Sequence, residues 1–132
     1  MRIGKFAQAT GLSINTLRYY DKFGLLTPEK NNQRRSYSKT DLKRAREIIK
    51  LKTMNFSLSE MKRLFVLDQE MEKGLKTGII SNEVAQEGLD LLELKYQEII
   101  RRELQLKEIK KQLQHLIGKM KGFIQKRVSA HE

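Results

Sequence analysis

Hydrophobic residues recur at helical spacing in the first part of the chain, in two short runs separated by a glycine. The first run ends at Gly11, and the second begins after Ser13 and ends at Gly24. Glycine suits the left-handed cap at the end of a helix, and serine accepts a hydrogen bond at the start of one. Two helices joined by so short a turn form a helix-turn-helix, which the pattern therefore predicts.

The next segment, residues 25–38, lacks helical spacing and consists of two extended runs around a polar tip. The first run is Leu25 to Thr27, the tip is 29–33 and the second run is 34–38. The tip contains adjacent asparagines, which tolerate turn conformations. We therefore expect a small two-stranded ribbon here.

Capping boxes predict two further helices. In a capping box, a serine and an acidic residue three positions later satisfy each other's backbone amides. Ser38 and Asp41 begin the first of these helices, and Ser57 and Glu60 begin the second. Between the helices, Asn55 suits a left-handed turn. The pattern favours a second helix-turn-helix unit on the other side of the ribbon.

From about residue 82 to residue 127 the chain carries one long heptad pattern without proline. At 1.5 Å per residue such a helix spans ~67 Å, too long to bury its apolar seam against the rest of the chain. A second copy of the helix would bury the seam, so we expect a homodimer. The seam positions are Ala85, Leu89, Leu92, Tyr96, Ile99, Glu103, Leu106, Lys110, Leu113, Ile117, Met120 and Ile124.

Charge is distributed unevenly along the chain. Residues 1–66 carry 15 basic and 5 acidic side chains, residues 67–132 carry 12 and 11, and the formal total is +11. The usual partner of a cationic module is a polyanion, and nucleic acid is the first candidate. A basic surface that serves only solubility is the alternative interpretation.

One face of the second predicted helix is polar and lies opposite its core residue Leu17. It combines amide, hydroxyl, phenol and cationic groups, which suit contacts to phosphates and base edges in a DNA major groove. An ordinary solvated face is the alternative, but an aromatic side chain exposed to water favours an interface. The residues of this recognition face are Asn15, Thr16, Arg18, Tyr19 and Lys22.

The ribbon adds Arg34, Arg35 and Tyr37 to the basic surface. In an extended chain Arg35 and Tyr37 share one side, and Arg34 takes the other. A basic ribbon beside a recognition helix would straddle the phosphate backbone or enter the neighbouring groove, whereas a solvated hairpin tip is the plainer alternative. Lys52 and the other cations of the following helix extend the positive field.

Composition disfavours several other classes of protein. The chain has no cysteine, which excludes disulfides, thiolate metal sites and cysteine nucleophiles. It shows no phosphate loop or catalytic motif, so we expect neither an enzyme nor a cofactor. No apolar run approaches the ~18 residues of a membrane span, and no signal-peptide block is present, so we expect a cytoplasmic protein without membrane contact.

The first 66 residues resemble the MerR family of bacterial transcription regulators. Phe56-Ser57-Leu58 looks like the second wing of that family, and the long helix is similar to its antiparallel dimerisation helix. The matching stretches are Ile3 to Ala7, Thr16 to Asp21, Gly24 to Leu26, Arg34 to Ser38 and Asp41-Leu42.

The resemblance implies a mainly α-helical chain with a winged helix-turn-helix module. It divides the chain into this module at 1–66, a connecting helix or linker at 67–81, an antiparallel coiled-coil helix at 82–127 and a tail at 128–132. In an antiparallel pair, Glu103 of one copy would meet Lys110 of the other, which is a hypothesis about the two polar positions of the seam.

The resemblance also implies a function. A homodimer would bind double-stranded DNA at a near-palindromic operator and would bend and untwist it, so that RNA polymerase engages the promoter. The recognition face would contact the major groove. Arg34, Arg35 and Tyr37 would hold the DNA backbone from the first wing, and Lys52 from the second.

Two function classes stay open at this point, a transcription regulator and an architectural or chromosome-anchoring protein. The architectural protein would use the same module but bind many sites with similar affinity.

The sequence also bears on which effector the chain could sense. The absence of cysteine and the short segment after residue 127 disfavour the metal, thiol and large-drug sensing of relatives. A small effector could still bind at 67–81, near Gly74 and Gly78.

Overall fold

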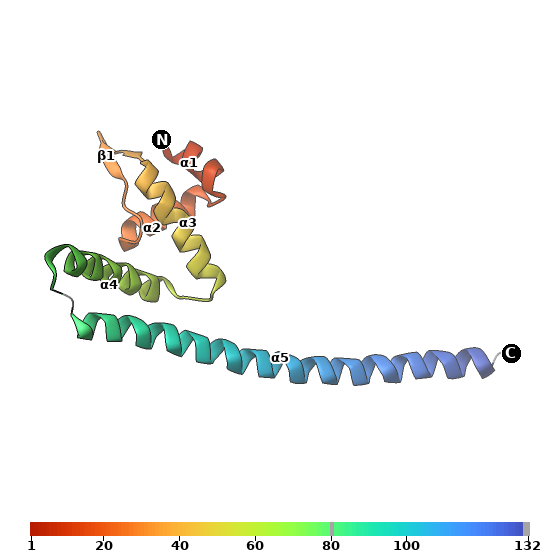
Figure 1. Ribbon diagram of the computed structural model, residues 1–132. Helices are drawn as coiled ribbons and strands as arrows, with labels where there is room; N and C mark the ends of the chain where they lie inside the picture. The colour runs from red at the N-terminus through yellow and green to blue at the C-terminus, as the bar shows by residue number, and fades with distance from the viewer. Residues whose placement is uncertain (80, 131–132) are drawn as a thin grey trace. The chain divides into compact units, whose positions relative to one another are not determined.

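The computed structural model describes residues 1–79 and 81–130 as a mainly helical chain with one β-hairpin (Figure 1). The chain divides into two compact units, Met1–Leu91 and Leu92–Glu132. This confirms the predicted fold class, a winged helix-turn-helix followed by a long C-terminal helix. In chain order the elements are α1 (Ile3–Thr10), α2 (Ile14–Phe23), β1 (Glu29–Asn31), β2 (Arg34–Ser36), α3 (Lys39–Thr53), α4 (Leu58–Thr77) and α5 (Asn82–Ala130).

The predicted helix-turn-helix is confirmed, and local hydrogen bonds account for its boundaries. Gly11 and Gly24 follow α1 and α2 in the left-handed conformation, with φ of 78° and 83°. The hydroxyl of Ser13 accepts a hydrogen bond from the backbone amide of Thr16 at 3.0 Å and caps α2. Each signal acts within a few residues, which is why the sequence reveals it.

The hairpin that forms the wing differs from the predicted ribbon. Its strands are β1 and β2, joined by Asn32 and Gln33 with positive φ of 51° and 65°, as a two-residue type I′ turn requires. The predicted first strand, Leu25 to Thr27, is wrong. The backbone amides of Leu25 and Leu26 donate instead to the carbonyl of Tyr20, and both side chains are buried in the core.

Both predicted capping boxes are present, at Ser38 with Asp41 and at Ser57 with Glu60. Asn55 takes the expected left-handed turn between α3 and α4, with φ of 70°. The second of these helices, α4, continues past the predicted module boundary at residue 66.

The predicted connecting segment, 67–81, contains the C-terminal half of α4. Within it, Gly74 is buried, and Gly78 caps α4 in the left-handed conformation with φ of 76°. Ile80 lies outside the described residues. The segment in which a small effector was expected to bind is therefore largely helical. The turn between α4 and α5 begins at Gly78.

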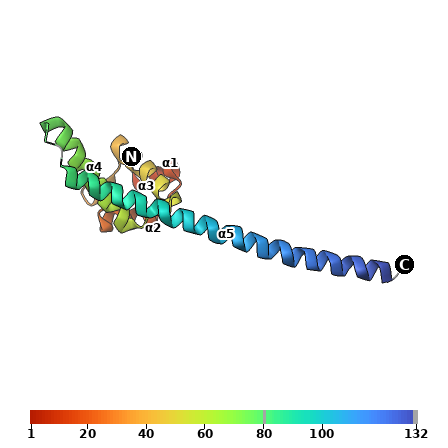
Figure 2. The same cartoon turned by 60° about the horizontal axis from the view of Figure 1, so that its bottom comes forward.

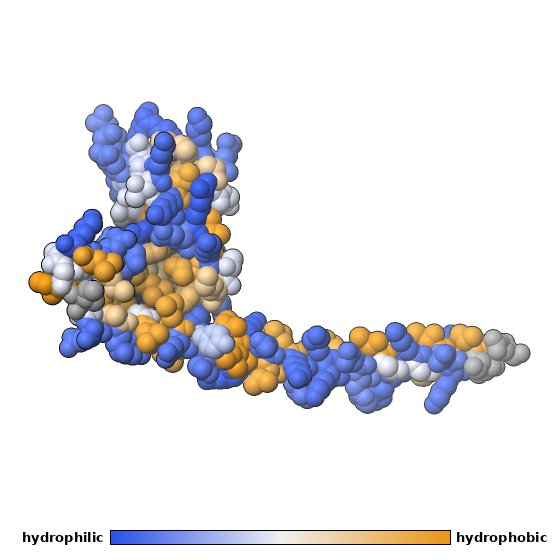
Figure 3. All heavy atoms as spheres, in the orientation of Figure 1, coloured by the Kyte–Doolittle hydropathy of each residue, from blue (hydrophilic) through white to orange (hydrophobic). Residues whose placement is uncertain are grey.

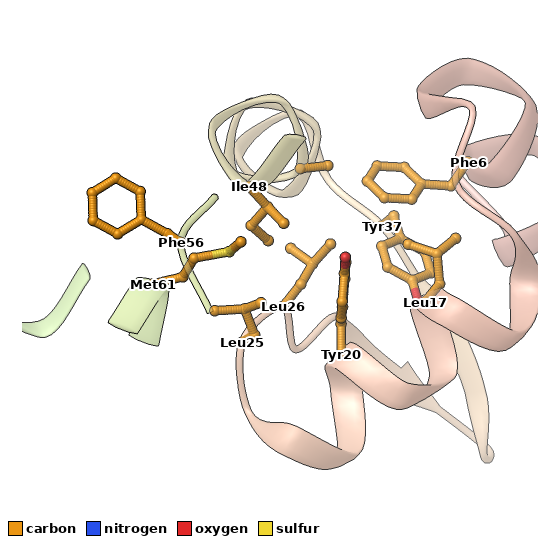
Figure 4. Close-up of a cluster of buried hydrophobic side chains, with 10 residues drawn as sticks. Phe6, Leu17, Tyr20, Leu25, Leu26, Tyr37, Ile48, Phe56 and Met61 are labelled. Carbon is orange, nitrogen blue, oxygen red and sulfur yellow. The ribbon is translucent and has the colours of Figure 1, made fainter. Parts of the chain in front are cut away.

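A single hydrophobic core joins the wing to the helices. Phe6 of α1 stacks on Tyr37 with 4.1 Å between ring centroids, and Leu17 of α2 lies beside them (Figure 4). Each buried side chain of this size contributes ~1.5–3 kcal/mol of transfer free energy. The buried cluster comprises Phe6, Leu17, Tyr20, Leu25, Leu26, Tyr37, Ala45, Ile48, Phe56 and Met61.

The last helix, α5, is uninterrupted from Asn82 to Ala130 (Figure 2). It begins where the sequence predicts, but it continues into the predicted tail at 128–132, of which residues 131–132 lie outside the described chain. Within the described residues, no helix is both long and apolar enough to cross a membrane.

Two glycines of the first helical region provide a test of the fold. Gly4 lies in α1 with ordinary φ and Gly11 has φ of 78°, and a Cβ at either position would meet nothing within 4 Å. We expect Gly4→Ala to stabilise the protein by about 0.5 kcal/mol, because alanine loses less entropy in a helix. Gly11→Ala should cost about 1 kcal/mol, because the left-handed conformation strains an L side chain. Urea denaturation measures both, and changes of the same sign would contradict the cap assignment.

Candidate nucleic-acid interface

The outward face of α2 is exposed because its opposite face is held in the core. Leu17, Tyr20 and Asp21 are buried, and this fixes the rotation of the helix. Tyr19 is 54% exposed and stacks on Phe23 with 6.2 Å between ring centroids. Of the predicted recognition face, Asn15, Arg18, Tyr19 and Lys22 are exposed and Thr16 is half-buried.

A contact from α4 holds the C-terminal end of α2. The ammonium of Lys62 donates a hydrogen bond to the carbonyl of Phe23 at 2.8 Å and lies 5.1 Å from the centre of its ring. On the same helix, Phe65 packs under the guanidinium of Arg44, which lies 3.8 Å above the ring. These contacts fasten α4 to α2 and α3, and so help to fix the recognition face.

A hollow of about 470 Å³ joins the recognition face to the predicted second wing. Asn15, Thr16 and Tyr19 line it from α2, Lys52 from the end of α3, and Ser57 from the turn before α4. We call this the Lys52 hollow. The fold therefore brings Lys52 beside α2.

A second hollow, of about 400 Å³, lies between α2 and the wing, and we call it the arginine hollow. Arg18, Arg34 and Arg35 are interface residues expected from the sequence, whereas no sequence pattern singles out Arg2 or Gln33. Only the fold brings Arg2 and Gln33 into one hollow with the three expected arginines. The lining residues are Arg2, Ile3, Arg18, Gln33, Arg34 and Arg35.

A buried carboxylate ties the wing to α2. The side chain of Asp21 is 4% exposed, accepts a hydrogen bond from Arg35 Nε at 2.7 Å, and lies 3.0 Å from Lys30 Nζ. Burial by itself raises the pKa of Asp21, but the hydrogen bonds and charges of Arg35 and Lys30 outweigh it, so the pKa lies below its ordinary value. Arg35 is thus engaged within the protein.

The expectation that Tyr37 holds the DNA backbone from the first wing does not fit the burial of its side chain. Its side chain is 3% exposed and stacks on Phe6, and its hydroxyl has no hydrogen-bond partner among residues 1–79 and 81–130. Burial raises the pKa of Tyr37. β2 ends at Ser36, so the alternation of side chains between the two faces of a strand does not extend to Tyr37. The side chain of Tyr37 lies in the core instead.

Hydrophilic side chains project over the N-terminal elements (Figure 3). This surface contains the wing and α3, which carry most of the unbalanced cations of residues 1–66. The module thus combines a positive field with the exposed polar face of α2, and these two features suit contact with a polyanion.

Comparison with known proteins decides the family. The family sequence model for the MerR HTH family regulatory protein matches residues 1–66 of the chain. The chain belongs to the MerR family.

Two relatives extend the match beyond the module to most of the chain. The HTH-type transcriptional regulator HmrR of Rhizobium leguminosarum bv. viciae is 30% identical over 123 residues, covering 92% of this chain and 88% of HmrR. The uncharacterized HTH-type regulator YyaN of Bacillus subtilis is 37% identical over 123 residues, with 91% and 85% covered.

A solved MerR-type structure is similar to the chain. It is the cryo-electron microscopy structure of an EcmrR–DNA complex in EcmrR-RPo, with a TM-score of 0.54 and 27% identity, covering 87% of this chain and 39% of EcmrR. Members of this family are DNA-binding transcriptional regulators, and none of these similarities indicates an enzyme family.

The Asp21 pair predicts a pH-dependent stability. Asp21→Asn should lower the free energy of unfolding by roughly 1–3 kcal/mol at neutral pH, because Arg35 and Lys30 lose their buried partner. Since the folded pKa is lowered, the wild-type contribution is present above the ordinary pKa of aspartate and is lost as pH falls through the folded value. The difference between the two proteins should therefore shrink in acid. Urea denaturation across this pH range measures it.

Glu29→Gln is the matched control for this prediction, because it also removes one carboxylate from the wing. Glu29 is exposed, and no ion pair of Glu29 occurs within the described residues. We expect it to change stability by less than about 0.5 kcal/mol. Equal losses in the two variants would show that Asp21 has no special part in holding the wing.

Proposed function

We propose that the chain is a transcription regulator that binds one near-palindromic promoter operator as a homodimer and distorts the DNA to modulate access of RNA polymerase. The observation that carries the proposal is the recognition face, which α2 exposes between the Lys52 hollow and the arginine hollow in a MerR-family module. The EcmrR–DNA complex in EcmrR-RPo supports DNA and RNA polymerase as partners.

The apolar seam of α5 supports the homodimer. Leu89, Ile99 and Met120 are 47%, 41% and 63% exposed in a single chain, and the other predicted dimerisation residues are exposed as well. A helix that leaves such a seam in water is stabilised by a second copy, which buries it. The other seam residues of the proposal are Leu92, Tyr96, Leu106, Leu113 and Ile117.

A two-fold dimer sets a geometric requirement on its DNA. Two copies of the recognition face related by a two-fold axis read two inverted half-sites, so the operator takes near-palindromic symmetry. Bending or untwisting a site costs several kcal/mol, roughly 1–6 for smooth bending, and contacts from both modules offset that cost. Dimerisation and DNA distortion therefore depend on each other in this proposal.

Selection of duplexes from a random-sequence pool with the full chain tests the function. We expect an inverted repeat that binds at least about 10³-fold more tightly than scrambled DNA. Arg18→Ala and Tyr19→Ala should each weaken binding about tenfold or more, by loss of groove contacts, whereas Lys111→Ala on α5 should have little effect. Similar affinity for all duplexes would identify an architectural protein instead, and equal effects of the three variants would contradict the recognition face.

Charge reversal on α5 tests the antiparallel dimer. Lys110→Glu should weaken the dimer about tenfold, because it places like charges opposite Glu103 of the second copy, at a cost of about 1 kcal/mol or more. Adding Glu103→Lys should restore association. Lys111→Glu makes the same charge change next to the seam and should leave the dimer intact. Sedimentation equilibrium measures all three, and unchanged sedimentation of Lys110→Glu would exclude the pairing.

A further inference from the structure

The arginine hollow contains more positive charge than the protein itself neutralises. Of its arginines, Arg35 is paired with Asp21. Within the described residues, Arg2, Arg18 and Arg34 have neither an ion pair nor a side-chain hydrogen bond, and no carboxylate lines the hollow. Three guanidinium groups around one concave surface favour an anion whose oxygens they can share.

Backbone contacts hold Arg2 at this hollow. Arg2 forms an isolated antiparallel bridge with Ser36 of β2, and the amide of Tyr37 donates to the carbonyl of Met1 at 2.7 Å. The chain before α1 therefore lies along the wing. Arg2 is the residue that caps α1, but its side chain makes no cap hydrogen bond and stays available.

The position of the hollow relative to α2 indicates which anion it takes. At about 100° per residue, Thr16 and Arg18 lie about 160° apart around α2. Thr16 lines the Lys52 hollow, in which Lys52 is the one cation among mainly apolar lining residues, and Arg18 lines the arginine hollow. The recognition face therefore has a cation beside it on each side, with the greater positive charge on the side of the wing. A helix in a major groove lies between two phosphodiester strands, and phosphates of opposite strands would meet the two hollows.

We propose that Arg2 is a DNA-binding residue which, with Arg18 and Arg34, binds one backbone phosphate on the wing side of α2. Arg35 is a positioning residue in this site, because Asp21 engages it and it acts by holding the wing. The proposal rests on the DNA-binding function proposed above and adds to it a strand-specific phosphate contact.

A pair of variants with the same charge change tests the site. Arg2→Gln should raise the Kd for the selected duplex about tenfold at physiological salt and reduce the salt slope by about 1, the values for one lost phosphate contact. Lys5→Gln removes one exposed charge from α1 but lines neither hollow. It should raise the Kd by less than about twofold. Equal effects of the two variants would overturn the proposal.

Neutral methylphosphonate substitutions, scanned along both strands of the duplex, locate the contact. One substitution should weaken binding of Arg2→Gln clearly less than it weakens binding of the wild-type chain, because the variant has already lost one of the contacts to that phosphate. If every substitution weakens both proteins by the same factor, Arg2 touches no phosphate and the proposal fails.

Two controls separate the possible failures. Thermal unfolding should be the same for Arg2→Gln and the wild type, because Arg2 meets the wing through its backbone. A wild-type chain that binds no duplex overturns the DNA-binding function, and this inference with it. A wild-type chain that binds, with Arg2→Gln no weaker than Lys5→Gln, overturns only the inference.

Discussion

The ion pairs of the buried Asp21 carboxylate are the interactions on which the arrangement of the wing and α2 depends. The carboxylate lies on the core side of α2 and accepts contacts from Arg35 and Lys30, one on each strand of the wing. A buried charge of this kind is tolerated only when it is paired, so the wing cannot leave α2 without exposing or unpairing it. The orientation of the wing therefore follows from the rotation of α2.

The aromatic stack of Phe6 on Tyr37 reinforces this arrangement from the other side. It connects α1 to the chain directly after β2, while the backbone of Met1 pairs with that of Tyr37. The wing is thus fastened at its strands by charge and at its base by hydrophobic packing. One consequence is that Arg2, at the start of α1, comes to lie beside Arg18 and Arg34.

The long helix α5 meets a different constraint. Its apolar seam stays exposed in one chain, and hydrophobic surface of that extent favours association. The positive charge is concentrated in residues 1–66, and the second half of the chain is almost neutral. In the proposed dimer, pairing through α5 would bring together two cationic modules without strong repulsion between the helices themselves, as binding of two half-sites on one duplex requires.

The sequence by itself determined the helices, their caps and the exposed face of α2. Gly11, Ser13 and the capping boxes act through hydrogen bonds that join residues three or four positions apart, so a local pattern contains the whole signal. The periodicity of α2 likewise separates Leu17 from Tyr19 without reference to the rest of the chain.

Only the tertiary structure decided which residues of the wing region face water. Leu25 and Leu26 have the composition of a strand but fill the core, and Tyr37 turns inward where the alternation of the strand ends. Asp21 and Arg35 are 14 positions apart, and Arg2 meets Ser36 across about half of the module. Such contacts depend on how the whole chain packs, and no local pattern of hydrophobic and polar residues carries that information.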